Sequence, residues 1–244
     1  MKKTALITGG ARGIGRAVAL TLAGEGWQLA INYHTSGRAA QELAARLEAE
    51  GCPALALQAD VACPQQVQAM VQAAAERFGG IDLLVNNAGI AQQKLFTDIT
   101  PDDWRQMMAV NLDGVFHCTQ AVLGPMIARQ RGCIINISSI WGMVGASCEV
   151  HYSAAKAAVI GMTKALAKEL GPSGIRVNCV APGVIDTDMN GGLDAETLGG
   201  LREQTPLGSI GSSEDVARLV AFLASEQAGF ITGQVISPNG GFVI

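Results

Sequence analysis

Short apolar runs alternate with amphipathic stretches from one end of the chain to the other. The apolar runs lie at residues 4–8, 28–32, 54–58, 82–86, 133–138, 176–181 and 234–237. Apolar runs without polar alternation are typical of parallel strands that are buried on both faces. Helical periodicity occupies residues 13–24, 36–50, 64–78, 102–130, 152–170 and 213–225. Pro64 and Pro101 fall near two expected helix starts, where a missing N–H costs little.

This alternation predicts an α/β fold. Successive β-α-β units with right-handed crossovers build a doubly wound sheet, so we expect one Rossmann domain over residues 1–244, with seven parallel strands flanked by helices. No repeat, low-complexity tract or change of composition divides the chain. Residues 186–213 interrupt the rhythm with glycine pairs and Pro206. We interpret this segment as a partly helical substrate lid, because it leaves the carboxyl edge of a strand; an ordinary surface excursion is the alternative.

Composition and charge argue against several other classes of protein. The net charge is −4 and no stripe of Lys or Arg is present, so binding of nucleic acid is not expected. No apolar stretch reaches the roughly 20 residues that span a bilayer, and the apolar start is too short for a signal peptide; we therefore expect a cytoplasmic protein. The 6 cysteines form no Cys-x-x-Cys pair and the 3 histidines are dispersed. Neither a disulfide framework nor a metal site is expected.

A glycine-rich turn, residues 8–15, follows the first predicted strand. Its glycines would let the backbone approach a pyrophosphate at the N-terminus of the next helix. An acidic residue about 20 positions further on would bind a ribose 2′-hydroxyl and repel a 2′-phosphate. Residues 32–36 occupy that region and contain no carboxylate, whereas Arg12, Arg38 and the hydroxyl groups of Thr35 and Ser36 could receive a phosphate. The sequence therefore predicts NADP(H) as the cofactor, with solvated surface residues as the alternative.

The chain resembles the short-chain dehydrogenase/reductase family over nearly its whole length. The turn has that family's Thr-Gly-x-x-x-Gly-x-Gly spacing, and an Asn-Asn-Ala-Gly run follows at residues 86–89. The resemblance implies a catalytic group of Asn111, Ser139, Tyr152 and Lys156. The residues that it implies for cofactor binding are Gly9, Arg12, Gly13, Ile14, Gly15, Asn32, Asp60, Val61, Asn87, Ala88, Gly89, Tyr152, Lys156, Pro182, Gly183, Ile185 and Thr187. Among these, Asp60 and Val61 should hold the adenine, and Ile185 and Thr187 the nicotinamide carboxamide.

Tyr152 and Lys156 stand four residues apart in a helical pattern and should share a face. A free phenol titrates near about 10, so a shift to about 7 requires about 4 kcal/mol of preferential phenolate stabilisation. An exposed ion pair contributes about 1 kcal/mol or less, so Lys156 must act in a shielded site. By the family resemblance, Tyr152 exchanges the proton, Ser139 binds the substrate oxygen and Asn111 holds a water in a relay to the lysine.

The length of the chain, the Tyr-Ser-Ala-Ala-Lys run at residues 152–156 and the Asn-Gly-Gly-Phe run at residues 239–242 resemble those of bacterial 3-oxoacyl-[acyl-carrier-protein] reductases. This resemblance implies reduction of a carrier-bound 3-oxoacyl thioester. Relatives that dock the carrier present arginines near the entrance, around the positions that Gln130 and Ser173 occupy here. The neighbouring Arg129, Arg131 and Arg176 are candidate substitutes, without a residue-for-residue match.

A second departure lies just before Tyr152, where Trp141 and residues 145–151 should wall the substrate pocket. Glu149 would place a carboxylate there and favour a cationic substrate. The segment resembles a branch that reduces an aminopentanone group on a lysine of elongation factor P. A carboxylate that points to backbone or solvent is the alternative.

Other functions stay open on the same residues. Hydroxysteroid and sugar-alcohol dehydrogenases share the fold, and a dinucleotide-sensing scaffold would be a non-enzymatic use of it. The family resemblance also implies a homotetramer, with residues 102–130 and 152–170 at a four-helix interface. No membrane or nucleic-acid partner is expected.

Overall fold

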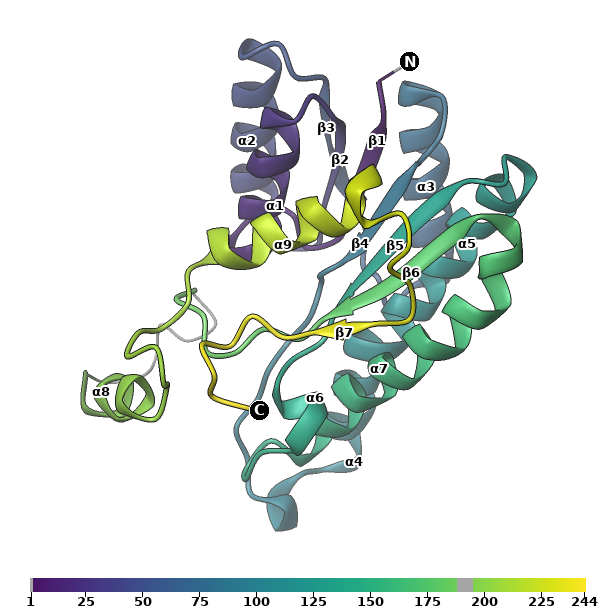
Figure 1. The fold of residues 1–244 in the computed structure, drawn as a ribbon. Helices are drawn as coiled ribbons and strands as arrows, with labels where there is room; N and C mark the ends of the chain where they lie inside the picture. Colours follow the sequence, from purple (N-terminus) through teal and green to yellow (C-terminus); the bar gives the residue numbers. More distant parts are fainter. Residues whose placement is uncertain (1, 188–194) are drawn as a thin grey trace.

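The computed structural model describes residues 2–187 and 195–244, and its core is one seven-stranded parallel sheet (Figure 1). The strand order is β3-β2-β1-β4-β5-β6-β7. The strands are β1 (Thr4–Ile7), β2 (Gln28–Tyr33), β3 (Ala54–Gln58), β4 (Leu83–Asn86), β5 (Gly132–Ile137), β6 (Ile175–Val180) and β7 (Val235–Ile236). The predicted Rossmann sheet is confirmed, with strand ends displaced by one residue at most.

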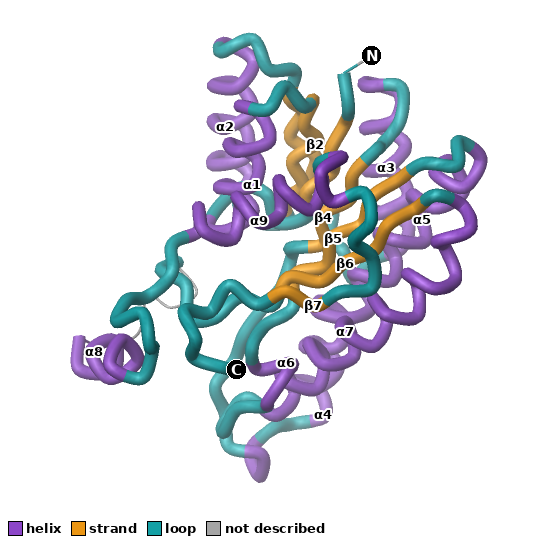
Figure 2. The backbone as a smooth tube through the Cα atoms, in the orientation of Figure 1, coloured by secondary structure: helices purple, strands orange, loops and turns teal. Residues whose placement is uncertain are grey.

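Helices cover both faces of this sheet (Figure 2). The helices are α1 (Gly13–Gly24), α2 (Gly37–Ala49), α3 (Pro64–Phe78), α4 (Pro101–Met108), α5 (Gly114–Ala128), α6 (Trp141–Val144), α7 (Val150–Leu170), α8 (Ala195–Glu203) and α9 (Ser213–Ala224). Helices α1, α2 and α9 pack on one face, and α3, α5 and α7 pack on the other. Pro64 and Pro101 each open a helix, as predicted.

Each strand sends alternate side chains into two separate cores. In β1, Ile7 joins the cluster under α1, α2 and α9, whereas Leu6 joins the cluster under α3, α5 and α7. Ile135 and Ile134 divide in the same way in β5. All four side chains are fully buried. Because both faces are covered, most positions of a central strand are apolar, which explains the long apolar runs; Asn86 and Asn136 are buried polar exceptions.

The predicted helical stretch over residues 102–130 is confirmed for most of its length, but it is not one regular α-helix. The structure has two helices, α4 and α5, joined by a π-helical turn at Ala109–Asp113. Within this turn, the Asn111 amide donates from Nδ2 to the Ile90 carbonyl (3.0 Å) and accepts from the Ile90 N–H (3.2 Å). The wider turn brings Asn111 to the loop after β4. Hydrophobic periodicity does not reveal one extra residue in a turn, and such turns are frequent at functional sites.

The strand order reverses between β1 and β4, which places a crevice at the carboxyl ends of these strands. The proposed lid at residues 186–213 begins at this edge, and Asp186 N–H donates to the Gly211 carbonyl (2.9 Å) near its far end. Helix α8 lies within the segment, and residues 188–194 fall outside the described part of the chain. Its role as a lid stays a prediction.

All six cysteines are free thiols, of which Cys118, Cys133 and Cys179 are buried. Across residues 2–187 and 195–244, no helix combines the length and apolar character needed to cross a membrane. In the same described ranges, no three His, Cys, Asp or Glu side chains gather as potential metal ligands.

Candidate active site

The glycine-rich turn after β1 and the loop after β4 form one hydrogen-bonded unit. The Thr8 hydroxyl accepts from the N–H groups of Asn87 (2.9 Å) and Ala88 (3.0 Å). In return, Asn87 Nδ2 donates to the carbonyls of Thr8 (2.9 Å) and Gly9 (3.1 Å). The structure therefore brings together two motifs that lie almost 80 residues apart in the sequence.

Gly15 allows this close approach because no side chain fits at its position. A Cβ atom there would lie 2.3 Å from the Gly9 carbonyl oxygen and 2.6 Å from Asn87 Nδ2. We expect Gly15→Ala to destabilise the fold by about 1–3 kcal/mol, the usual range for overpacking, and to weaken dinucleotide binding. Thermal unfolding and calorimetric titration measure the two effects. Gly24→Ala in the same helix is the control, since a Cβ there meets nothing within 4 Å; equal losses in both variants would contradict the explanation.

Asn32 lies behind the turn and supports it. Its buried side chain accepts from the Gly9 N–H (3.2 Å) and donates to the Ala59 carbonyl (3.0 Å). Asn32 can therefore affect a cofactor by fixing Gly9. Asp60, expected near the adenine, accepts from the Ala62 N–H (2.9 Å) and faces His34 Nε2 at 4.0 Å. Val61 is buried.

The two arginines that could recognise a phosphate differ in their surroundings. Arg12 is the exposed N-cap residue of α1 and forms no ion pair with any residue that the structure describes. Arg38 pairs instead with Glu42 on the outer side of α2, at 2.7 Å. Arg12 is therefore the better placed of the two, at the turn itself.

The second half of the site lies where β5 ends and α7 begins. Lys156 Nζ donates to the Ile137 carbonyl (3.0 Å) and lies 5.7 Å from the centre of the Tyr152 ring. Ser139 hydrogen-bonds to the Tyr152 side chain, and its hydroxyl accepts from the Trp141 N–H (3.1 Å). Tyr152, Lys156 and Ser139 are all buried. The four-residue spacing placed both α7 side chains on one face, as predicted.

Burial controls the protonation of both groups in the free chain. It raises the pKa of Tyr152 to about 12, with the Ser139 hydrogen bond opposing the rise and Glu149 adding to it. Burial also lowers the pKa of Lys156 to about 8, against a smaller opposing effect of Cys179. At neutral pH the phenol is therefore protonated and can serve as an acid.

Asn111 reaches this group through Gly89. A Cβ on Gly89 would lie 2.7 Å from Asn111 Oδ1 and 3.4 Å from Lys156 Nζ, so the glycine fits between these two side chains. The Asn111 amide is engaged with the main chain of Ile90 and Met107. A water relay to the lysine stays a prediction.

The segment after β6 connects the two halves of the site. The Pro182 carbonyl accepts from the Ile140 N–H (3.0 Å), just beyond Ser139. Gly183 N–H donates to the Pro238 carbonyl (3.1 Å), and Ile185 is buried. Further on, Thr187 Cγ2 lies 3.6 Å from where a Cβ on Gly13 would stand. The segment thus runs from the candidate catalytic group to the glycine-rich turn.

The Trp141 N–H donates to Ser139, and Glu149 lies close enough to Tyr152 to raise the pKa of its phenol; that both residues wall a substrate pocket stays a prediction. The Trp141 ring packs edge-to-face on Phe242 (5.8 Å between centroids), a C-terminal residue that sequence reasoning did not assign to the pocket. Glu149 is half-buried, and burial raises its pKa, while a hydrogen bond from Gln93 opposes the rise. The contacts of Gln93 and its neighbour Gln92 were also missed, because no motif marks them.

The candidate docking arginines lie at the opposite edge of the sheet. Positions 129–131 and 173–176 precede or open β5 and β6, about 20 Å from the carboxyl ends at about 3.3 Å per residue. Arg129 donates to the Ile81 carbonyl (2.6 Å), and Arg176 to those of Leu223 (2.7 Å) and Ser225 (3.2 Å). These two guanidinium groups bind the main chain of their own fold, and a docking role for Arg129, Arg131 or Arg176 stays a prediction.

Comparison with known proteins decides the family. A family model described as enoyl-(acyl carrier protein) reductase matches residues 9–243. The chain belongs to the short-chain dehydrogenase/reductase family. It is 44% identical to a 3-oxoacyl-[acyl-carrier-protein] reductase FabG of Staphylococcus aureus over 241 residues, covering 99% of this chain and 98% of the relative.

Two further relatives carry the same reductase name. One, from Synechocystis sp., is 44% identical over 243 residues, and the other, from Chlamydia muridarum, is 41% identical over 244 residues. In both, the match covers 99% of this chain and 97% of the relative. As a short-chain dehydrogenase/reductase, the chain is an oxidoreductase acting on CH–OH and C=O groups with a nicotinamide dinucleotide.

The geometry fits this cofactor. The turn approaches the loop after β4 so closely that Gly15 admits no Cβ, and it leads into the N-terminus of α1, where main-chain N–H groups favour a pyrophosphate. Gly9 and Gly13 both adopt positive φ (61° and 50°), which this tight path requires. The strand order reverses between β1 and β4, which is where sheets of this kind bind a dinucleotide at the carboxyl ends of their strands.

Proposed function

We propose that this chain reduces a ketone with NADPH, and that its substrate is a 3-oxoacyl thioester carried on acyl carrier protein. The observation that carries the proposal is the buried group of Tyr152, Ser139 and Lys156 beside the glycine-rich turn. The reductase names of relatives at 41–44% identity support the substrate class.

A nicotinamide dinucleotide held by the glycine-rich turn would supply the hydride for the carbonyl carbon. Ser139 and Tyr152 hold the carbonyl oxygen by their hydroxyl groups, and Tyr152 donates its proton to that oxygen as negative charge develops. Lys156 then stabilises the phenolate in a site that water reaches poorly. Asn111 acts through Ile90, by keeping the loop with Gly89 against Lys156.

A panel of carbonyl compounds tests the reaction. We expect loss of NADPH absorbance with an acetoacetyl thioester, in carrier-bound form above all, and little turnover with a steroid ketone or a sugar ketone. Dinucleotide binding without turnover of any ketone would favour the sensing scaffold instead.

Arg12 should set the preference for NADPH. A charge-assisted hydrogen bond contributes about 1.5–3 kcal/mol, so Arg12→Ala is expected to raise Kd for NADP⁺ roughly 10- to 100-fold and to change Kd for NAD⁺ little. Calorimetric titration of both dinucleotides checks this. The control is Arg16→Ala, also exposed on α1 but one turn further on. Parallel losses for both dinucleotides would remove the assignment of Arg12 to the 2′-phosphate.

A ketone that carries an amine is the second candidate substrate, because of Glu149. Its carboxyl is half-buried and close enough to raise the pKa of Tyr152. A nearby ammonium would offset that charge. An aminopentanone-modified lysine of elongation factor P belongs in the same panel; a higher kcat/KM for it than for the acetoacetyl thioester would select this candidate.

We also propose a cytoplasmic homotetramer. Exposed aromatic side chains support it, among them Phe116 on α5 and Phe230, which is fully exposed near β7. Protein interfaces are enriched in aromatic side chains, and exposed apolar side chains mark them where they form a contiguous patch. Sedimentation equilibrium measures the assembly, and a monomer at micromolar concentration would exclude it.

A further inference from the structure

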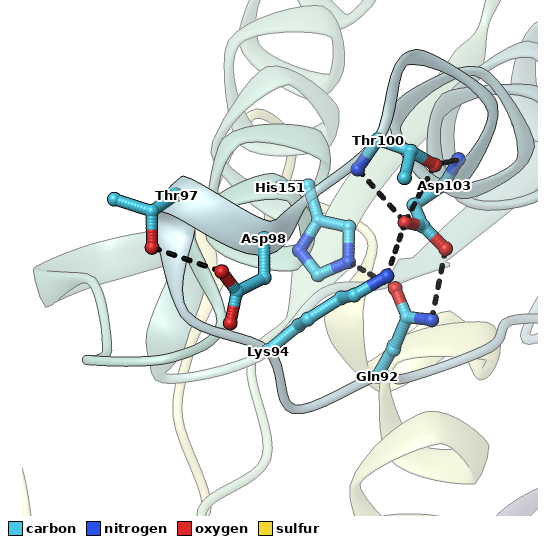
Figure 3. Close-up of polar contacts among 7 residues, drawn as sticks. All are labelled: Gln92, Lys94, Thr97, Asp98, Thr100, Asp103 and His151. Carbon is cyan, nitrogen blue, oxygen red and sulfur yellow. Dashed lines mark hydrogen bonds and ion pairs between the residues drawn. The ribbon is translucent and has the colours of Figure 1, made fainter.

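Three consecutive residues of the loop after β4 are joined to the segment that leads into Tyr152. Lys94 N–H donates to the Cys148 carbonyl (2.7 Å), and Gln93 Nε2 donates to Glu149 Oε1 (3.5 Å). Gln92 Oε1 lies 2.9 Å from Nε2 of His151, the residue immediately before Tyr152 (Figure 3). The loop therefore lies along the start of α7.

Asp103 fixes the other end of this connection. Its carboxylate accepts from Lys94 Nζ (2.6 Å), Gln92 Nε2 (3.1 Å) and the N–H and hydroxyl of Thr100 (2.9 and 2.7 Å). The hydrogen bond from Lys94 is the main reason why the pKa of Asp103 lies well below its usual range. The hydrogen bonds from Thr100 and Gln92 lower this pKa further. Asp103 is therefore a permanent acceptor at the start of α4.

This acceptor determines the protonation of His151. An ionised carboxylate only accepts hydrogen bonds, so the Gln92 NH₂ must face Asp103 and its carbonyl oxygen must face His151. His151 then has to donate from Nε2. That leaves Nδ1 as a bare lone pair, buried and without a hydrogen-bond partner in the described chain. A proton on Nδ1 would have no acceptor.

The charges around the ring agree with this assignment. Burial lowers the pKa of His151, Lys94 lowers it further, and the Asp103 carboxylate on α4 opposes the shift. The lowered pKa favours the neutral ring.

The first turn of α7 depends on external support. Its N-cap residue, Glu149, makes no side-chain capping bond, and Cys148 before it has a positive φ of 63°. Both features weaken a helix start, because the first N–H groups lack a side-chain acceptor and the backbone is strained. Tyr152 lies in this turn, so its position relies on contacts with neighbouring segments.

We propose that His151, as the neutral Nε2–H tautomer bonded to Gln92, is a positioning residue that holds Tyr152 in place by joining the start of α7 to the loop after β4. The inference deepens the proposed ketone reduction and rests on it for its kinetic part. A misplacement of about 1 Å can lower a rate roughly 100-fold.

Two substitutions of His151 separate hydrogen bonding from titration. His151→Gln keeps an N–H donor near the Nε2 position and cannot become charged, whereas His151→Leu removes the donor. We expect His151→Leu to lower kcat roughly 10- to 100-fold with KM little changed. In the wild type, we expect kcat to fall at acid pH as His151 becomes charged. His151→Gln should recover most of kcat and should show no such fall. Gln92→Leu breaks the same hydrogen bond from the other side. Gln72→Leu is its control, because the Gln72 side chain donates to Glu76 (2.8 Å) on the exposed face of α3.

Two further measurements do not depend on catalysis. The chain has 3 histidines, so nitrogen NMR of labelled histidine can assign each tautomer, with His34→Gln and His117→Gln identifying the other two signals. It also has 2 tyrosines, so a Tyr33→Phe background reports the Tyr152 phenol alone by ultraviolet titration. In that background, His151→Leu and Gln92→Leu should bring the phenol pKa from about 12 back toward the ordinary value near 10.

These outcomes decide the proposal. A neutral Nε2–H tautomer with a shifted phenol titration in both variants supports it. An Nδ1–H tautomer, an ordinary histidine titration, or wild-type phenol behaviour in Gln92→Leu would overturn it. Absence of ketone reduction by the wild-type chain would overturn the proposed function, while the tautomer and the phenol titration would still decide the positioning.

Discussion

Tyr152→Phe is expected to lower kcat for ketone reduction by about three orders of magnitude, within the range that a positioned acid contributes. The substitution removes one oxygen from a buried ring and leaves the packing of α7 with β5 and β6 in place. The dinucleotide should still bind, so the loss appears in the chemical step. Single-turnover mixing of enzyme, NADPH and ketone measures that step directly.

The pH dependence provides a second test of the same role. Reduction needs the protonated phenol, and burial raises the pKa of Tyr152 to about 12 in the free chain. In the Tyr33→Phe background, about a tenth of the phenol should therefore be ionised at about pH 11, where a free tyrosine would be about nine-tenths ionised. Tyr33→Phe alone is the kinetic control and should keep its activity. Turnover by Tyr152→Phe at the wild-type rate would exclude the phenol as the acid.

Lys156→Met is expected to stabilise the fold at pH 7 while it abolishes turnover. Burial lowers the pKa of Lys156 from 10.5 to about 8, a difference of about 2.5 units, or about 3 kcal/mol. The lost bond to the Ile137 carbonyl offsets about 1 kcal/mol, so a net gain of about 2 kcal/mol remains. Stability given up to keep a charged group in an active site is a frequent trade-off.

The sign of this effect depends on pH. Below about pH 8 both folded and unfolded chains hold the lysine proton, and the full penalty of burying the charge applies. Between about 8 and 10.5 the folded chain loses the proton first, so the wild type gains stability relative to Lys156→Met. Urea unfolding at a series of pH values measures the difference. Lys164→Met, exposed on the same helix, should show no such trend; a pH-independent difference for Lys156→Met would contradict the buried charge.

The sheet was predictable because local pattern and global fold agree along most of the chain. Strands such as β5 are buried on both faces, so Ile134 and Ile135 are both apolar although they enter different cores. Glycine-rich turns mark the carboxyl ends of strands. The joint between α4 and α5 was not predictable, because the π-helical turn depends on the contact between Asn111 and Ile90.

The candidate site shows the same division. The spacing of Tyr152 and Lys156 predicts a shared helix face, since helical geometry is local. The direction in which the Asn32 side chain points could not be predicted from the sequence, because its partners Gly9 and Ala59 come from other segments. The arginines at 129 and 176 show a similar limit: positive charge is visible in a sequence, whereas the carbonyl groups that bind it are not. The protonation of Tyr152 follows from burial, which a motif does not report.

The wide turn at Ala109–Asp113 means that the position of Asn111 depends on the number of residues between α4 and α5. Deletion of one residue there would close the wide turn, so that α4 and α5 become one regular α-helix whose later side chains keep roughly their present faces. Asn111 would leave Ile90, and the backbone at Gly89 would lose its lateral restraint. A surface loop would tolerate the loss of one residue. Here the same loss would free the loop that holds Gly89 between Asn111 and Lys156, so the cofactor side of the site would no longer be fixed relative to Tyr152.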